Sequence, residues 1–137
     1  MPIEAGIYQK LRDDAGVSAL VSGRIFGSRL PKDVTYPAVV WQVVVTQELG
    51  YNFQGASGLR MKRFQFDSYS KNYIDSVKIS DTIRALLESY SGTLPDGSKV
   101  NGCVVIADMD FPYEVGPSSI GGFVHRRMLE VDFIYGE

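Results

Sequence analysis

Few residues in this chain are of the types that carry out catalysis, and none stands in a catalytic pattern. His125 is the single histidine and Cys103 the single cysteine. A Ser–His or Cys–His nucleophilic site would have to use His125. That residue lies beside two arginines near the start of a predicted strand, which favours a surface or interface histidine. Cys103 begins a run of alternating apolar residues, where a small buried side chain is the simpler interpretation.

Two short spacings have part of a ligand-binding motif without completing it. Asp108 and Asp110 offer carboxylate oxygens of the kind that hold a hard cation, but no third acidic ligand follows in a nearby motif. A polar strand edge is therefore the favoured interpretation. Gly55 and Gly58 precede a predicted strand and lack the Lys-Ser/Thr pair of a phosphate-binding loop. With no metal-spaced Cys/His set, we expect no catalytic residue, metal or cofactor, and the chain is not predicted to be an enzyme.

Length, composition and charge are those of one ordinary globular domain, which we place over residues 1–137. The 137 residues are 45% hydrophobic, so the chain can fold without disulfides or a metal. The 14 basic and 16 acidic residues give a formal net charge of −2, which argues against a strongly basic nucleic-acid-binding protein. The sequence has neither a signal-peptide pattern nor an apolar run of about 18 residues. We therefore expect synthesis in a cytoplasm and no membrane partner.

The spacing of apolar residues predicts the elements that must position these groups. Ile3, Ile7 and Leu11 follow one face of a helix, which Asp13 and Asp14 end. A second short helix follows over residues 15–21, and the longest helical stripe predicts the main helix over residues 70–90. Period-2 alternation and β-branched runs predict four strands, over residues 38–46, 60–68, 102–111 and 123–135.

This order predicts an α+β fold. We expect a mostly antiparallel four-stranded sheet made of two hairpins, with one long helix and the N-terminal helices packed on one face. Residues 27–36, 48–59 and 112–122 are predicted loops because they are rich in Gly, Pro and polar residues. The strand over residues 38–46 is apolar on both faces, so we expect both faces to be covered, one of them by a neighbouring subunit.

Basic residues open two of the predicted strands, and both strands follow a long predicted loop. The two basic sets could therefore lie at the same end of the sheet. A ring built from this domain could present them to its lumen or to a partner. For any one of them, a solvated strand face is the simpler interpretation. The candidate basic cluster consists of Arg60, Lys62, Arg63, Arg126 and Arg127.

Several short motifs follow one another in a distinctive order. After the acidic pair that ends the first helix, residues 17–26 read Val-Ser-Ala-Leu-Val-Ser-Gly-Arg-Ile-Phe, and residues 36–40 read Tyr-Pro-Ala-Val-Val. A Gly-Ala-Ser-Gly tip at 55–58 leads to Phe-Gln-Phe-Asp at 64–67, and Val-Asp-Phe-Ile-Tyr at 131–135 closes the last strand. In this order and spacing the chain resembles the small phage tail-completion proteins, the tail terminator or head-to-tail joining family.

The resemblance implies a structural role in a phage or prophage. Such proteins cap the growing tail tube as a ring, commonly a hexamer, and offer the surface that joins the filled head. The implied partners are further copies of the chain, the tail tube protein and the head connector or completion protein, with DNA only passing through the lumen. The implied location is the head-proximal end of the virion tail, after assembly in the host cytoplasm. The aromatic anchors of the two long loops would be Tyr51, Phe53, Phe111 and Tyr113.

Two rival classes remain open at this point. A dimeric ferredoxin-like module that binds a small molecule or a protein has similar elements, and a closed pocket in a dimer would distinguish it. An enzyme built from scattered Asp, Ser and Tyr residues would reveal itself by turnover that depends on His125 or Asp108. Neither rival accounts for the motif order over residues 17–45.

Overall fold

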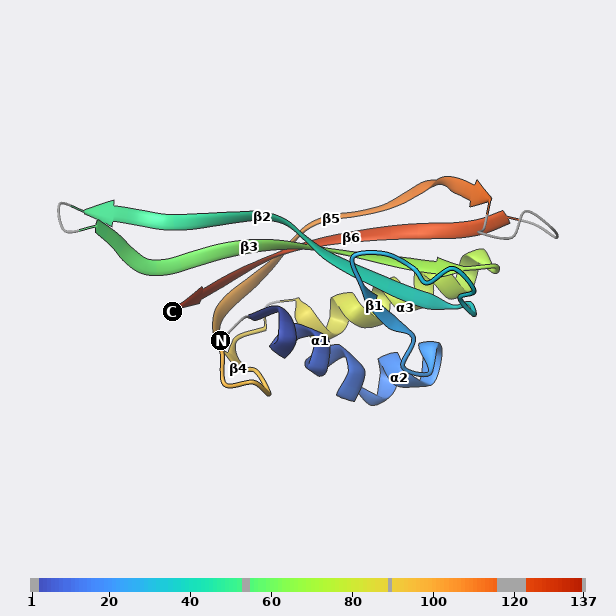
Figure 1. Ribbon diagram of the computed structural model, residues 1–137, viewed down its shortest axis with the longest axis horizontal. Helices are drawn as coiled ribbons and strands as arrows, with labels where there is room; N and C mark the ends of the chain where they lie inside the picture. Colours follow the sequence, from blue (N-terminus) through green and yellow to red (C-terminus); the bar gives the residue numbers. More distant parts are fainter. Residues whose placement is uncertain (1–2, 53–54, 89, 116–122, 137) are drawn as a thin grey trace.

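A curled six-stranded sheet carries a layer of helices on one face (Figure 1). The strands lie in the order β1-β2-β3-β6-β5-β4. The helices are α1 (Ile3–Asp13), α2 (Ala15–Val21) and α3 (Tyr73–Leu87). The strands are β1 (Ile25–Gly27), β2 (Ala38–Asn52), β3 (Gly55–Ser70), β4 (Gly92–Thr93), β5 (Lys99–Val115) and β6 (Phe123–Gly136).

This computed structural model describes the backbone over most of the chain, at residues 3–52, 55–88, 90–115 and 123–136. The side chains are described for the same residues except 48–59 and 111–123.

Both α2 and α3 begin where a short polar side chain satisfies a free backbone N–H group. Asp14 caps α2 by accepting a hydrogen bond from the Val17 backbone N–H at 3.0 Å. Ser22 then ends α2 in the left-handed conformation, with φ at 54°. Asn72 caps α3 by accepting from the Ile74 N–H at 2.9 Å. The main helix is therefore shorter at both ends than the predicted 70–90.

The predicted four-stranded, mostly antiparallel sheet is wrong, although the α+β class holds. The structure has a six-stranded mixed sheet, because two short segments join it as edge strands. β1 pairs in parallel with β2, with Ile25 opposite Val39, and β4 pairs with the start of β5, with Thr93 opposite Lys99. Strands of three and two residues are too short to show period-2 alternation, so the sequence pattern does not reveal them.

The two hairpins are also longer than expected. β2 and β3 remain paired as far as Asn52 opposite Gly55, within the predicted loop at 48–59. β5 continues to Val115, opposite Phe123, through the start of the predicted loop at 112–122. Gly and Pro indicated loops there, but the pairing of β5 with β6 skips Pro112 between Phe111 and Glu114. A proline, which has no N–H to donate, is tolerated in an edge strand or at a bulge.

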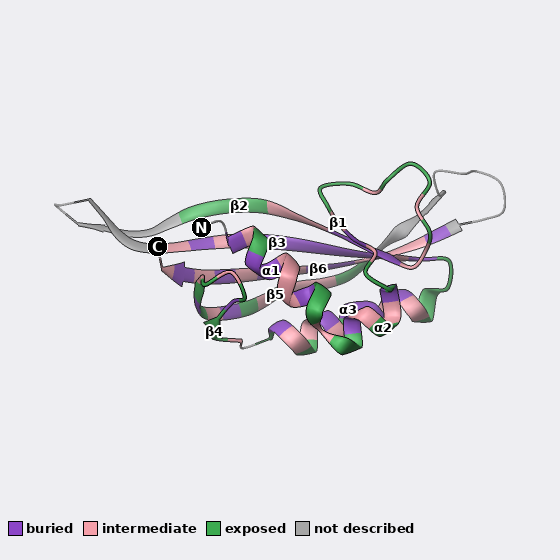
Figure 2. Ribbon diagram, turned by 60° about the horizontal axis from the view of Figure 1, so that its bottom comes forward, coloured by how far each residue is buried: buried purple, intermediate pink, exposed green. Residues whose placement is uncertain are grey.

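The core lies between one face of the sheet and the helices. Phe64 and Phe66 of β3 and Phe133 of β6 are fully buried, and the rings of Phe64 and Phe133 meet edge to face at 5.1 Å. Ile7 of α1 and Ile83 of α3 close this layer from the other side. The buried colour in Figure 2 runs along the middle strands and the facing sides of the helices.

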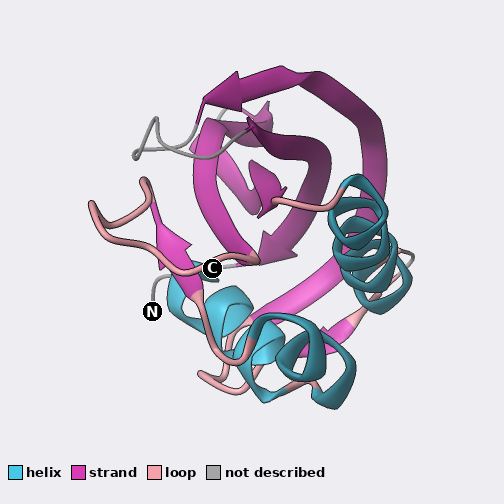
Figure 3. Cartoon of the chain, turned by 90° about the vertical axis from the view of Figure 1, so that its right-hand side faces the viewer, coloured by secondary structure: helices cyan, strands magenta, loops and turns pink. Residues whose placement is uncertain are grey.

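Bulges bend the sheet into a half-barrel. The pairing slips at Val44 in β2 and at Ile106 in β5, where one strand has an extra residue. A bulge increases local twist and bends its strand. Viewed along the long axis, the strands follow a curved path that leaves the helices on the outside (Figure 3). The outer strands β2 and β5 thus lie toward the two margins of the curl.

Candidate interaction site

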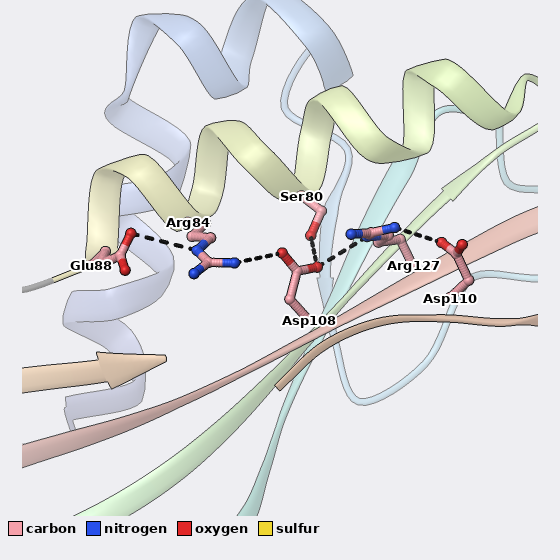
Figure 4. A network of polar contacts seen from close by, with 6 residues as sticks. All are labelled: Ser80, Arg84, Glu88, Asp108, Asp110 and Arg127. Carbon is pink, nitrogen blue, oxygen red and sulfur yellow. Dashed lines mark hydrogen bonds and ion pairs between the residues drawn. The ribbon is translucent and has the colours of Figure 1, made fainter. Parts of the chain in front are cut away.

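A polar cluster joins α3 to the β5–β6 hairpin (Figure 4). Asp108 is its centre. The carboxylate of Asp108 accepts hydrogen bonds from Ser80 Oγ at 3.4 Å and Arg84 Nη1 at 3.1 Å, both on α3. From β6, Arg127 donates through Nε to Asp108 at 3.0 Å and through Nη1 to Asp110 at 2.8 Å. One helix and two strands are therefore held together by a continuous chain of charge-assisted hydrogen bonds.

Tyr73 and Asp110 extend this cluster to the first turn of α3. The Tyr73 hydroxyl donates to Asp110 Oδ2 at 2.7 Å. This bond raises the pKa of Tyr73 above its usual value, and it lowers the pKa of Asp110, with the Arg127 guanidinium adding to the second effect. The His125 ring meets the Tyr73 ring edge to face at 5.6 Å. The predicted surface or interface histidine thus packs against the start of α3.

The cluster shows how the Asp108 and Asp110 carboxylates are used in this fold. Both carboxylates point to arginines, so their oxygens are already engaged by positive charge. In the described part of the chain, no group of three or more potential ligands is arranged to hold a metal. The geometry therefore supports a structural role for Asp108 and Asp110, as ion-pair partners of arginines.

Cys103 lies on the helix-facing side of β5, opposite Phe133 of β6. Burial raises the pKa of its thiol to about 12. At neutral pH the group is a thiol rather than a thiolate, and only a thiolate is an efficient nucleophile. Cys103 therefore behaves as a small core residue.

The five basic residues do not form one cluster. β3 and β6 are antiparallel, with Arg60 opposite Tyr135 and Arg126 opposite Tyr69. The expectation that both sets lie at one end of the sheet is wrong, because β3 opens at the end where β6 closes. Carboxylates of the same chain hold several of these side chains, in the pairs Lys62–Glu4, Arg63–Asp132, Arg126–Asp67 and Arg127–Asp108.

Three of these acidic partners, Glu4, Asp67 and Asp132, are site residues that the sequence analysis did not identify. Asp67 is nearly fully buried, and it accepts from Gln65 Nε2 at 3.0 Å as well as from Arg126. The register of β3 against β6 indicates these ion pairs. Arg63 lies directly opposite Asp132, and Asp67 lies two residues along β3 from Tyr69, the residue opposite Arg126. A correct pairing of the two strands would have predicted both ion pairs, since opposite charges across a ladder attract.

Arg60 lines a polar cleft at the opposite end of the molecule from α3's first turn. The cleft has a volume of about 640 Å³ and lies beside the turn between β4 and β5. Lys62 and Lys99 add positive charge to its wall, and Asp96 adds one acidic group.

The four predicted aromatic anchors belong to the two hairpins. Tyr51 lies in β2 opposite Ala56, and Phe111 lies in β5 opposite Arg126. Tyr113 also lies in β5. Their side chains, and Phe53 as a whole, lie outside the described residues. The hairpins themselves extend in opposite directions, β2–β3 to the left and β5–β6 to the right in Figure 1. They are separated by the length of β6, about 45 Å for its 14 residues.

Comparison with known families decides the class of the protein. A family model described as "Tail completion protein gp17" matches residues 5–114. The chain belongs to this tail completion family. A chain in the solved structure titled "Virion of native gene transfer agent (GTA) particle" is similar over 98% of this chain and 95% of its own length, with a TM-score of 0.74 and 15% identity. That likeness shows a shared fold. Curated protein sequences give no match.

This tail completion protein is thus a structural phage tail protein. The resemblance drawn from the motif order is confirmed. The family match favours a tail protein over the dimeric ferredoxin-like module and over an enzyme. None of the helices in the described residues is both long and apolar enough to cross a membrane.

Proposed function

We propose that this protein caps the tail tube as a ring of six copies. The ring forms the interface that joins the tail to the head. The membership of residues 5–114 in the tail completion family is the observation that carries the proposal. The role is structural rather than enzymatic. The ring stands at the head-proximal end of the tail, after assembly in the host cytoplasm, and DNA only passes through its lumen.

The two hairpins support contacts with two different partners. Because β2–β3 and β5–β6 extend toward opposite ends of the sheet (Figure 1), a ring of parallel copies would carry one circle of hairpins on each rim. One rim would meet the tail tube protein and the other the head connector or completion protein. Tyr51 and Phe53 would be the aromatic anchors of one rim, and Phe111 and Tyr113 those of the other.

The basic residues have a more limited role in this proposal. Lys62, Arg63, Arg126 and Arg127 are paired within the subunit, so a lumen lined by them would be close to neutral locally. Such a wall would let DNA pass without holding it, since tight binding requires many unneutralised cations. Arg60 lines the polar cleft beside the turn between β4 and β5.

The experiment combines assembly and function. Native mass spectrometry and negative-stain imaging over a concentration series would measure the oligomer, with and without purified tail tubes. In parallel, purified protein would be added to a lysate from a phage that lacks this gene. Such a lysate would contain heads and tails that are not joined. We expect rings with an open lumen at tail ends, and joined particles after addition. A closed dimer that leaves heads and tails separate would overturn the proposal.

A further inference from the structure

Two strands of the sheet have long edges without a strand neighbour. β1 pairs with β2 only as far as Trp41, and β4 pairs with β5 only at Lys99 and Val100. Beyond these points, within the described backbone, β2 is paired only with β3 and β5 only with β6. The segments concerned are residues 42–47, here called the β2 edge, and residues 101–109, here called the β5 edge. Their outward N–H and C=O groups can pair with another strand.

These two edges lack the side chains that normally prevent such pairing. Soluble proteins protect open edges with charged residues, especially Lys, or with Pro. The β2 edge has neither, and the only charged residue of the β5 edge is Asp108, which points to Arg84 and Arg127 under α3. Of the seven large hydrophobic side chains that are exposed among the described residues, five lie on these edges: Val44, Val45, Val104, Ile106 and Met109.

We propose that the β2 edge of one copy pairs antiparallel with the β5 edge of the next copy, so that the sheet continues across each subunit boundary. The proposal rests on the ring described under the proposed function and names the surface that builds it. The occupant of each edge is a second copy of this chain, because the two complementary edges belong to one molecule at opposite margins of one sheet.

The strand directions fit this arrangement. β2, β3, β6 and β5 are each antiparallel to the next, so β2 and β5 run in opposite directions. A neighbouring copy turned about an axis along the strands would bring its β5 antiparallel to β2. Pairing of β2 with β2 in a twofold dimer would leave both β5 edges open. Head-to-tail pairing covers both edges of every copy, and it repeats until the ring closes.

The bulges at Val44 and Ile106 determine the shape that repeated pairing can take. Bulged strands twist and curve the sheet, and a curved sheet that is extended by identical units returns on itself. A flat sheet with the same open edges would instead grow into a fibre. The half-barrel shape in Figure 3 therefore favours a closed assembly.

Cysteine cross-linking tests the pairing directly. Val44→Cys places a thiol on the β2 edge and Val104→Cys one on the β5 edge, at positions that are 47% and 54% exposed. A short bismaleimide that spans about 8 Å reaches both direct and diagonal neighbours across a strand pair. We expect the double variant to form a covalent ladder that ends at the ring number. A mixture of the two single variants should stop at dimers, and each single variant alone should stay monomeric on a denaturing gel.

Several controls make the result specific. Thr46→Cys with Ile106→Cys tests the same pairing at a second register. Ile74→Cys with Val104→Cys should give no ladder, because Ile74 is 56% exposed but lies on α3, away from both edges. The native Cys103 is buried and should not react. Dimers from Val44→Cys alone would indicate β2–β2 pairing and would overturn the proposal.

A charge variant separates this inference from the proposed function. Val44→Lys should raise the concentration needed for ring formation by about tenfold or more, whereas Ile74→Lys should leave it unchanged. If native mass spectrometry detects wild-type rings but neither cysteine pair gives a ladder, the edge pairing is wrong and the ring stands. If no rings form even with tail tubes and no ladder appears, both proposals fail.

Discussion

At the scale of the residue, Asp108 is the carboxylate on which the cluster under α3 depends. Its side chain is largely buried and neutralises both Arg84 and Arg127. Replacing it with Asn leaves two guanidinium groups short of a counter-charge, and a lost partner of a buried charged group costs more than the bond itself contributes. We expect Asp108→Asn to lower the free energy of unfolding by about 2 kcal/mol, as measured by urea denaturation.

The matched control for that change is Asp13→Asn. Asp13 is also paired with an arginine, Arg12, but at 3.8 Å and with both side chains more than half exposed. An exposed pair of this kind contributes less than about 1 kcal/mol. If the two variants lose the same stability, the cluster is not a clamp and its contacts are ordinary surface pairs.

Also at this scale, the bond from Tyr73 to Asp110 makes the cluster sensitive to acid. Because the pKa of Asp110 is lowered in the folded state, its stabilising effect is present above the ordinary carboxyl pKa and is lost as the pH falls through the lowered value. Tyr73→Phe removes the first cause of the shift. We expect the pKa of Asp110, followed by carboxyl-carbon NMR, to rise in this variant, although Arg127 remains.

An unchanged pKa of Asp110 in Tyr73→Phe would mean that the neighbouring positive charge, chiefly Arg127, sets it. The double variant with Asp110→Asn should then show the same acid stability as Asp110→Asn alone. If instead the hydrogen bond matters, Tyr73→Phe and Asp110→Asn should each reduce the loss of stability between neutral and acidic pH.

At the scale of the element, the approach of α1 to the turn before β5 depends on one glycine. A Cβ atom on Gly6 would lie 2.9 Å from the Leu94 Cβ and would overlap the Asp96 carboxylate. Alanine normally stabilises a helix interior relative to glycine by about 1 kcal/mol, but overpacking costs about 1–3 kcal/mol. We expect Gly6→Ala to lower the thermal midpoint of unfolding. A rise in that midpoint would show that α1 is not held so closely.

The elements also show which features could be predicted from the sequence. The stripe of Ile3, Ile7 and Leu11 and the alternation around Phe64 and Phe66 specify which face is buried, so the helices and the four main strands were predictable. Their helix-facing side chains form the observed core.

The remaining features depend on contacts between distant parts of the chain. Residues 25–27 form β1 because they pair with β2, from which a loop separates them in the sequence. Three residues are too few for a hydrophobic pattern that would predict a strand. The outer parts of the hairpins are strands because they pair with each other, despite their glycines. The ion pairs of Arg63 and Arg126 required the register of β3 against β6. These contacts therefore depend on which strands pair and in which register, and local sequence patterns do not specify either.

At the scale of the whole molecule, the sheet separates three kinds of contact. The helices cover one face, the open margins at β2 and β5 face sideways, and the two hairpins extend to opposite ends. In a ring built through the margins, neither hairpin is needed for contact between copies. Ring formation and docking to the two partners should therefore be separable by mutation.

Aromatic residues of the two hairpins should affect docking without affecting ring formation. Tyr51→Ala with Phe53→Ala changes the β2–β3 hairpin, and Phe111→Ala with Tyr113→Ala changes the β5–β6 hairpin. Large aromatic side chains commonly provide most of the affinity at an interface. We expect each double variant to form rings in native mass spectrometry but to lose one docking step. One variant should fail to bind tail tubes, and the other should cap tubes that then do not join heads, as counted in negative-stain images. If the first double variant restores joined particles as well as the wild type does, those aromatics are not anchors. If both variants fail at the same step, the hairpins meet one partner, and the two-rim arrangement is wrong.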